Sequence, residues 1–125
     1  MVKKIFSALN LPEPHPIPLM TVPFQIAQKL HAVSEAGSER AHDLVDLQLI
    51  VAHSELDMEE VRSKCRRLFD YRRMQPWPPT IVKGSGWDEL YQNAKGNLPI
   101  LQTVDEAIIW ANELIVRIES KNEGQ

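Results

Sequence analysis

Three charged residues near the middle of the sequence have types and a spacing that could do chemistry. Arg40, Asp43 and Asp46 follow one another at intervals of three residues, and the two aspartates lie inside a run rich in leucine and valine. In a helix this spacing places the three side chains on one face. Ionised carboxylates in an apolar setting are costly unless cations or hydrogen-bond donors meet them. Arg40 is one candidate partner and Lys29 is the other, because two helices joined by a short turn usually pack antiparallel.

Two interpretations of this cluster follow from the residue types. Lys29, Arg40 and the two aspartates could form a structural ion network that fastens two helices together. They could also form a site for phosphate binding or proton transfer, in which Lys29 holds an anion and an aspartate acts as a base or a metal ligand. Spacing alone favours neither interpretation, since both kinds of site gather the same side chains.

The elements that must position these side chains are predicted from prolines, caps and apolar periodicity. Alternating prolines at positions 12 to 18 exclude a helix there and predict an extended arm. A helix is expected from Pro23 to a stop at Gly37. A second helix is expected from an N-cap at Ser38 to about His53, and its apolar residues on every side predict that it is buried.

Three more helices complete the expected fold. Asp57 and Thr103 each begin a helix with a capping box, because Glu60 and Glu106 stand three residues further on. A shorter helix is expected over residues 87–95. The predicted fold class is therefore all-α: a helical bundle of four to five helices with an extended, proline-rich N-terminal arm.

The chain is expected to form one helical domain over residues 1–125, since domains cluster at about 100–150 residues. Its expected parts are the arm over 1–21, a helical core over 22–73, a loop rich in proline and tryptophan over 74–86, C-terminal helices over 87–120 and a tail over 121–125. A short strand is expected near Ile81 and Val82. The sequence leaves open whether Trp77 is exposed for docking a partner or folded over the core.

Composition and charge exclude several classes of protein. Among 125 residues, 14 are Lys or Arg and 17 are Asp or Glu, and the net charge of −3 argues against a protein that coats nucleic acid. The single cysteine, Cys65, excludes an internal disulfide, and the four histidines lack the spacing of a helical zinc site, so no metal site is expected. No segment approaches the roughly 20 apolar residues that span a bilayer, and no secretory signal is present, so the expected location is the cytoplasm.

The motifs that carry the charged cluster resemble those of a known family. The proline-rich run of residues 11–20 is followed by QKLHA at residues 28–32 and by RAHDLVDL at residues 40–47. In order, spacing and lead-in, these segments resemble the nucleotidyl transferase AbiEii/AbiGii toxin family over residues 9 to 50. Lys29 matches the lysine of the family's third motif. The fourth motif is matched by Arg40, Asp43 and Asp46.

The resemblance implies a nucleotidyltransferase core similar to that of polymerase β, and transfer from a nucleoside triphosphate (NTP) to an acceptor such as tRNA. Lys29 would contact the triphosphate, and Asp43 or Asp46 would act on the acceptor hydroxyl or position the lysine. For the complete family protein the resemblance implies Mg²⁺ and NTP. The candidate substrate-binding residues, in or beside the same motifs, are Gln25, Arg40 and His42.

The family's first two motifs, a Gly-Ser pair and an Asp-x-Asp pair that holds Mg²⁺, do not precede the proline-rich run. No Asp-x-Asp occurs in these 125 residues, and the Gly-Ser pairs at residues 37–38 and 84–85 come after that run. Phosphoryl-type transfer depends on metal ions that neutralise developing charge. We therefore expect a C-terminal helical part of such a protein, or a shortened relative, that is inactive alone and by itself needs no cofactor. The expected partners are a cognate antitoxin or an N-terminal catalytic half, and an acceptor RNA.

Two further surfaces support alternative functions. Six of the 14 cations fall within residues 62–73, and they could contact RNA or form a solvated helix face. The arginines of this segment are Arg62, Arg66, Arg67, Arg72 and Arg73. Ile109, Trp110 and Val116 lie off the main apolar stripe of the last helix and could mark a homodimer or partner interface. The alternatives to a transferase part are thus a non-catalytic module that docks an antitoxin or another protein, and an RNA-contacting helical domain.

Overall fold

The computed structural model describes residues 21–73 and 75–120, which form five α-helices and, within those ranges, no strand. The helices are α1 (Val22–Ser34), α2 (His42–Ala52), α3 (Met58–Arg72), α4 (Trp87–Lys95) and α5 (Val104–Glu119). The predicted all-α fold is therefore confirmed. Apart from Thr21, the predicted arm lies outside the described residues, and so does the predicted tail, residues 121–125.

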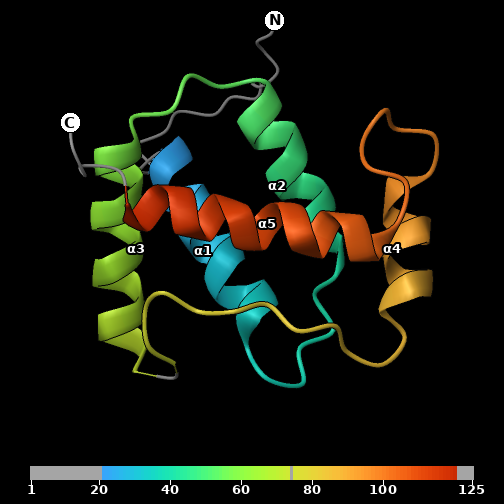
Figure 1. Cartoon of the computed structure of the whole chain (residues 1–125), viewed down its shortest axis with the longest axis horizontal. Helices are drawn as coiled ribbons and strands as arrows, with labels where there is room; N and C mark the ends of the chain where they lie inside the picture. Colours follow the sequence, from blue (N-terminus) through green and yellow to red (C-terminus); the bar gives the residue numbers. More distant parts are fainter. Residues whose placement is uncertain (1–20, 74, 121–125) are drawn as a thin grey trace, which may run out of the picture.

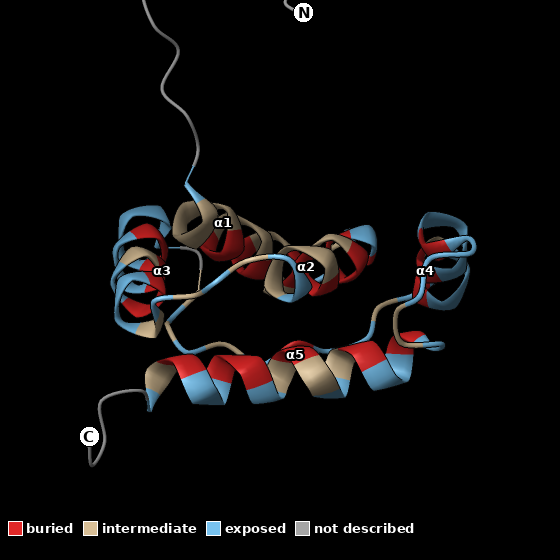
Figure 2. Ribbon diagram, turned by 90° about the horizontal axis from the view of Figure 1, so that it is seen from above, coloured by how far each residue is buried: buried red, intermediate tan, exposed pale blue. Residues whose placement is uncertain are grey.

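The helices are arranged in two layers with a helix at each end. Helices α1 and α2 lie on one side of the molecule, and α5 runs across the opposite side (Figure 1). Helix α3 packs against α1 and α5 at one end, and α4 packs against α2 and α5 at the other. The buried residues of the helices face the space between the layers (Figure 2). The core therefore forms where amphipathic helices turn their apolar faces toward one another.

Helix α1 begins one residue before the predicted Pro23. The hydroxyl of Thr21 accepts a hydrogen bond from the backbone N–H of Phe24 at 3.4 Å, which caps the helix. Pro23 lies in the first turn, where its missing N–H leaves no hydrogen bond unmade. Gly37, with a φ of 74°, takes the left-handed conformation that a stop after a helix favours. The buried face of the helix includes Ile26, Leu30 and Val33, which recur at helical spacing.

Helix α2 begins later than predicted, at His42, so Ser38 is not its N-cap. The Ser38 hydroxyl accepts from the backbone N–H of Arg40 at 3.0 Å, and this local turn takes the place of a first helical turn. The Ser38 carbonyl accepts from the indole N–H of Trp87 in α4 at 2.8 Å. A tertiary contact and a side-chain turn therefore delay the helix. Of its apolar residues Leu44, Val45 and Leu47 are buried as predicted, whereas Ala52 at the end of the helix is exposed.

The N-caps predicted for α3 and α5 are present, but only the capping box of α5 is complete. The Asp57 carboxylate accepts from two backbone N–H groups of the first turn of α3. Thr103 and Glu106 form the complete capping box of α5. Helix α4 has the predicted bounds, and at its end Lys95 is buried while Ala94 is exposed.

The short strand predicted near Ile81 does not form. The backbone N–H of Ile81 donates to Oδ1 of Asn112 in α5 at 2.8 Å, and its carbonyl accepts from Nδ2 of the same side chain at 3.2 Å. Backbone groups near the core need partners, and one amide side chain supplies both here. Ile81 is buried by this anchor, while Val82 is exposed.

Two isoleucines of α5, one buried and one exposed, test which face of the helix packs against the core. Ile115→Ala removes a side chain that is 2% exposed, and we expect it to lower the free energy of unfolding by about 2–5 kcal/mol through lost burial and a cavity. Ile109→Ala makes the same change on the same helix at a side chain that is 59% exposed, and should alter stability by less than about 0.5 kcal/mol. Urea unfolding measures both variants. Equal losses would mean that α5 packs through a different face.

Candidate functional site

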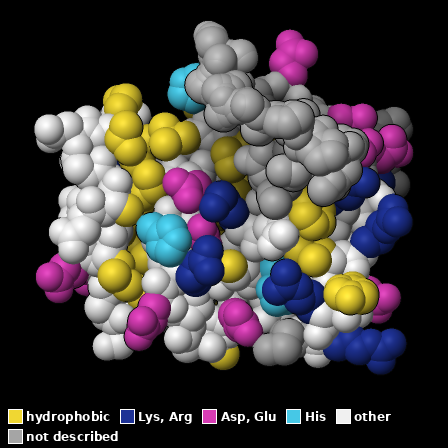
Figure 3. Space-filling model, turned by 180° about the vertical axis from the view of Figure 1, so that it is seen from behind, with side chains coloured by type: hydrophobic (Ala, Val, Ile, Leu, Met, Phe, Trp, Pro, Cys, Tyr) yellow, Lys and Arg dark blue, Asp and Glu magenta, His cyan; other side chains and the backbone are white. Residues whose placement is uncertain are grey.

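The charged residues predicted from their spacing come together where α1 meets the beginning of α2. The Nζ atom of Lys29 lies 3.1 Å from Oδ1 of Asp43 and 3.0 Å from Oδ2 of Asp46. The Nε atom of Arg40 lies 3.1 Å from Oδ2 of Asp43. One ammonium therefore links two carboxylates, and one carboxylate links two cations. On the face turned away from α5, basic, acidic and histidine side chains stand together (Figure 3).

The two aspartates differ in their access to solvent. The side chain of Asp43 is 0% exposed, that of Asp46 is 42% exposed, and that of Lys29 between them is 26% exposed. A buried carboxylate is stable only where cations and donors meet its oxygens, and Lys29 and Arg40 do so here. Lys29 thus bridges a carboxylate in the interior and a carboxylate at the surface.

The network keeps Lys29 charged. Burial lowers the pKa of Lys29, but hydrogen bonds to Asp46 and Asp43 and the negative charges of both outweigh burial, so the pKa is raised above its usual value. Lys29 is therefore protonated at neutral pH. It can neutralise an anion there, and it cannot serve as a general base.

A surface cavity of about 740 Å³ opens beside the network. Of the residues predicted for the site, Lys29, Arg40 and Gln25 line this cavity. The other predicted residues are not part of its wall. They are Asp43 and Asp46, which hold Lys29, and the half-exposed His42, whose Nε2 lies 3.6 Å from Oδ1 of Asp43.

Among the other residues of the cavity wall are His31 of α1 and Arg72 of α3. His31 is buried and meets the ring of Phe69 edge-on, with ring centroids 4.8 Å apart. Its Nε2 is the one buried side-chain nitrogen or oxygen of the described residues that has no hydrogen-bond partner. Burial and, secondly, the positive charge of Arg72 lower the pKa of His31, so the ring is neutral at neutral pH.

The basic cluster predicted on α3 is divided between two cavities: Arg66 and Arg73 line one, and Arg72 lines the other. Arg62 is buried, so it is not part of an exposed basic face. Arg66 pairs with Glu119 of α5, and Arg72 lines the Lys29 cavity. Arg67 is exposed. Helix packing thus distributes the arginines of one sequence segment over several places.

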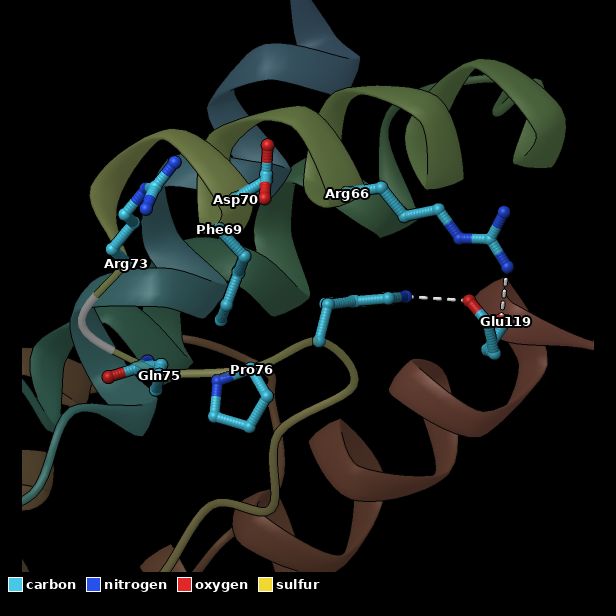
Figure 4. A pocket seen from close by; sticks show the side chains of 8 residues that line it. Arg66, Phe69, Asp70, Arg73, Gln75, Pro76 and Glu119 are labelled. Carbon is cyan, nitrogen blue, oxygen red and sulfur yellow. Dashed lines mark hydrogen bonds and ion pairs between the residues drawn. The ribbon is translucent and has the colours of Figure 1, made fainter.

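A second cavity, of about 720 Å³, lies between α3, the loop after it and the end of α5 (Figure 4). The indole N–H of Trp77 donates to Oε1 of Glu119 at 2.6 Å, and the indole ring packs against Phe69 with centroids 5.2 Å apart. Burial raises the pKa of Glu119, but hydrogen bonds from Arg66 and Trp77, with the charges of Arg66 and Arg62, outweigh it and lower the pKa. Of the two placements left open for Trp77, the structure has the one against the core.

The structure also gives the positions of Cys65 and of the three residues predicted to lie off the apolar stripe of α5. Cys65 is buried, and burial together with the charge of Glu119 raises the pKa of its thiol to about 12, so it is not a nucleophile at neutral pH. Ile109 and Val116 are exposed on α5, as their position off the stripe predicts, and Trp110 is half-buried.

Comparison with known families identifies the class of protein. Residues 2–113 match the family model described as Nucleotidyl transferase AbiEii toxin, Type IV TA system. This match covers most of the chain, so the chain belongs to that family and is a nucleotidyltransferase-like protein of a toxin–antitoxin system. Family membership implies a cognate antitoxin. A comparison with curated proteins finds no match.

The charged network does not fit the Mg²⁺ ion that such transfer requires. Both oxygens of Asp43 already face cations, and a divalent cation between Asp43 and Asp46 would meet the ammonium of Lys29. Within residues 21–73 and 75–120, no three His, Cys, Asp or Glu side chains gather closely enough to hold a metal ion.

Among the described helices, none combines the length and hydrophobicity that crossing a bilayer requires.

The first test of the network compares its two aspartates. Asp43→Asn should lower the free energy of unfolding by about 3 kcal/mol, because it leaves Arg40 unpaired and breaks a buried ion pair. Asp46→Asn should cost less than about 1 kcal/mol, because its pair with Lys29 is half-exposed. Urea unfolding at pH 7 measures both. Equally small losses would show that Asp43 does not hold the two helices together.

The second test uses the buried His31. The unfolded chain binds a proton at the ordinary pKa of 6.5 and the folded chain only at lower pH, so stability should fall as the pH drops from 7 to 5. His31→Phe keeps a ring against Phe69 without the titrating nitrogen and should flatten this dependence. His53→Phe removes an exposed histidine and should leave it in place. An unchanged pH profile in His31→Phe would assign the loss to other groups.

Proposed function

We propose that this chain is the helical part of a nucleotidyltransferase-like toxin and contributes Lys29, held by Asp43 and Asp46, to a site for NTP-dependent nucleotidyl transfer. One observation carries the proposal. A single ammonium is fixed by two carboxylates at 3.1 and 3.0 Å and also lines a cavity of about 740 Å³.

The chemistry of transfer favours a cation held in this way. Nucleotidyl and phosphoryl transfer depend mainly on positioning and on stabilising the charge of the phosphate oxygens. Because two carboxylates already orient Lys29, it needs little rearrangement when charge develops on a bound triphosphate. Arg40 adds a second positive group to the same wall.

The two aspartates take different roles in this proposal. Asp43 is fully buried, outside the cavity wall, and paired with both Lys29 and Arg40, so it is a positioning residue. Asp46 is half-exposed, so it is the carboxylate that an acceptor hydroxyl can reach. Asp46 is therefore the candidate base.

The Mg²⁺ ligands of the proposed site are not part of the charged network. The Gly-Ser and Asp-x-Asp pairs that the family places before the proline-rich run would supply the Mg²⁺ ligands. With those ligands a metal ion would neutralise charge on the transferring phosphate. The residues of this chain would bind and orient the triphosphate.

A non-catalytic docking module remains the second candidate function. The observation that favours it is Asp43, because its two oxygens find their cations within the chain, as in a purely structural network. The exposure of Lys29 and Asp46 beside a cavity favours the transferase part over this module. An RNA-contacting domain is supported least, since the arginines of α3 are divided between two cavities and the interior.

The proposed function is tested by supplying the two motifs. The chain is co-expressed with the segment of an AbiEii-family protein that carries the Gly-Ser and Asp-x-Asp pairs, and transfer of labelled nucleotide to total RNA is measured with Mg²⁺. Lys29→Ala should lower transfer by about 100-fold or more, the usual cost of losing one group that stabilises developing charge. Without the added segment, the chain should transfer nothing.

A matched control is available in Lys83. Its Nζ also bridges two aspartates, Asp88 at 3.1 Å and Asp105 at 3.3 Å, but it does not line the Lys29 cavity. Lys83→Ala should leave transfer unchanged. Transfer by the isolated chain, or full transfer by the complemented Lys29→Ala protein, would overturn the proposed function.

A further inference from the structure

Helix α3 reaches the Lys29 cavity with one basic residue. Arg72, in the last turn of α3, lines the cavity together with Lys29 of α1 and Arg40 before α2. The packing of α1 against α3 brings these residues together. The Arg72 side chain is exposed, and it forms no ion pair or hydrogen bond with any described residue.

Arg72 differs from Lys29 and Arg40 in having no carboxylate partner among the described residues. Carboxylates of the chain already meet the positive charges of Lys29 and Arg40. Arg72 therefore keeps its donors available for a ligand. A guanidinium presents five N–H groups in a planar fork that matches phosphate oxygens, and it remains charged at every physiological pH.

The remaining wall favours a ligand with donors as well as negative charge. Glu35 and Glu39 line the cavity and would repel a simple polyanion, but they accept hydrogen bonds from hydroxyl and amino groups. A nucleotide carries both kinds of group, phosphates at one end and sugar hydroxyls and base amino groups at the other. The volume of about 740 Å³ lies within the range of small-molecule sites, roughly 300–1,000 Å³.

A second observation at the same wall points to a ligand. The buried Nε2 of His31, in a residue that lines the cavity, has no hydrogen-bond partner. Buried polar atoms in native proteins nearly always have one, so this nitrogen calls for a partner that the described residues do not supply. The orphaned nitrogen and a guanidinium that pairs with no described residue belong to two different helices, α1 and α3, at one cavity.

We propose that Arg72 is a substrate-binding residue that contacts the phosphate groups of a nucleotide in the Lys29 cavity. This inference rests on the proposed function, since it concerns the nucleotide of that reaction. It extends the site from α1 and α2 to α3, which no motif of the sequence connects with Lys29.

The experiment measures nucleotide binding by the full chain. ATP, CTP, GTP, UTP and inorganic tripolyphosphate are titrated into the protein by calorimetry at low ionic strength. Arg72→Gln should weaken binding of the preferred nucleotide at least tenfold. Arg67→Gln neutralises another exposed arginine of α3 that is not in the cavity wall, and should change binding less than twofold. Tripolyphosphate should bind more weakly than the nucleotide, because it offers no donors to Glu35 and Glu39.

Thermal unfolding of each variant confirms that it is folded before binding is compared. Equal weakening by Arg72→Gln and Arg67→Gln would reduce Arg72 to a general surface charge and overturn the inference. Absence of nucleotide binding by the unaltered chain, or equally tight binding of tripolyphosphate, would overturn it as well.

The binding result for Arg72→Gln and the transfer result for Lys29→Ala together separate the role of Arg72 from the proposed function. If Arg72→Gln binds nucleotide normally while the complemented Lys29→Ala protein loses transfer, the role of Arg72 is wrong and the proposed function stands. If Arg72→Gln loses binding while Lys29→Ala retains full transfer, the cavity binds a nucleotide but the proposed function is wrong.

Discussion

The buried carboxylate of Asp43 is the constraint on which the arrangement of this protein depends. An ionised group without solvent contact is stable only where cations meet it, and Lys29 of α1 and Arg40 before α2 do so from two sides. The pairing fixes α1 against the beginning of α2. It also explains why an acidic residue is tolerated in the buried part of a helix rich in leucine and valine.

The same interaction connects the architecture to chemistry. Lys29 extends from the buried Asp43 to the half-exposed Asp46 and lines a cavity, so its position is set by the interior and its charge is presented at the surface. Groups that are fixed before a reaction begins stabilise developing charge most effectively. A structural network and a binding site are therefore compatible here, because one half of the network lies inside the protein and the other half lies at its surface.

Local signals predicted most of the fold. Capping residues and apolar periodicity act over three or four residues, and they located α3, α4 and α5 closely. The predictions that were wrong involve partners far away in the chain. The Ser38 carbonyl accepts from Trp87, and α2 begins later than expected. The backbone of Ile81 bonds to Asn112 and not to a strand. Propensity is a weak guide wherever a distant side chain satisfies the backbone.

The sequence alone determined the ion network, because Asp43 and Asp46 share a helix face and a short turn brings Lys29 of the preceding helix within reach. Only the tertiary structure decided how the arginines of α3 are used. One helix segment carries Arg62 into the interior, Arg66 to Glu119 and Arg72 to the Lys29 cavity. The physical reason is that spacing determines which residues share a face, whereas the neighbours that each face meets depend on how separate helices bury their apolar surfaces together.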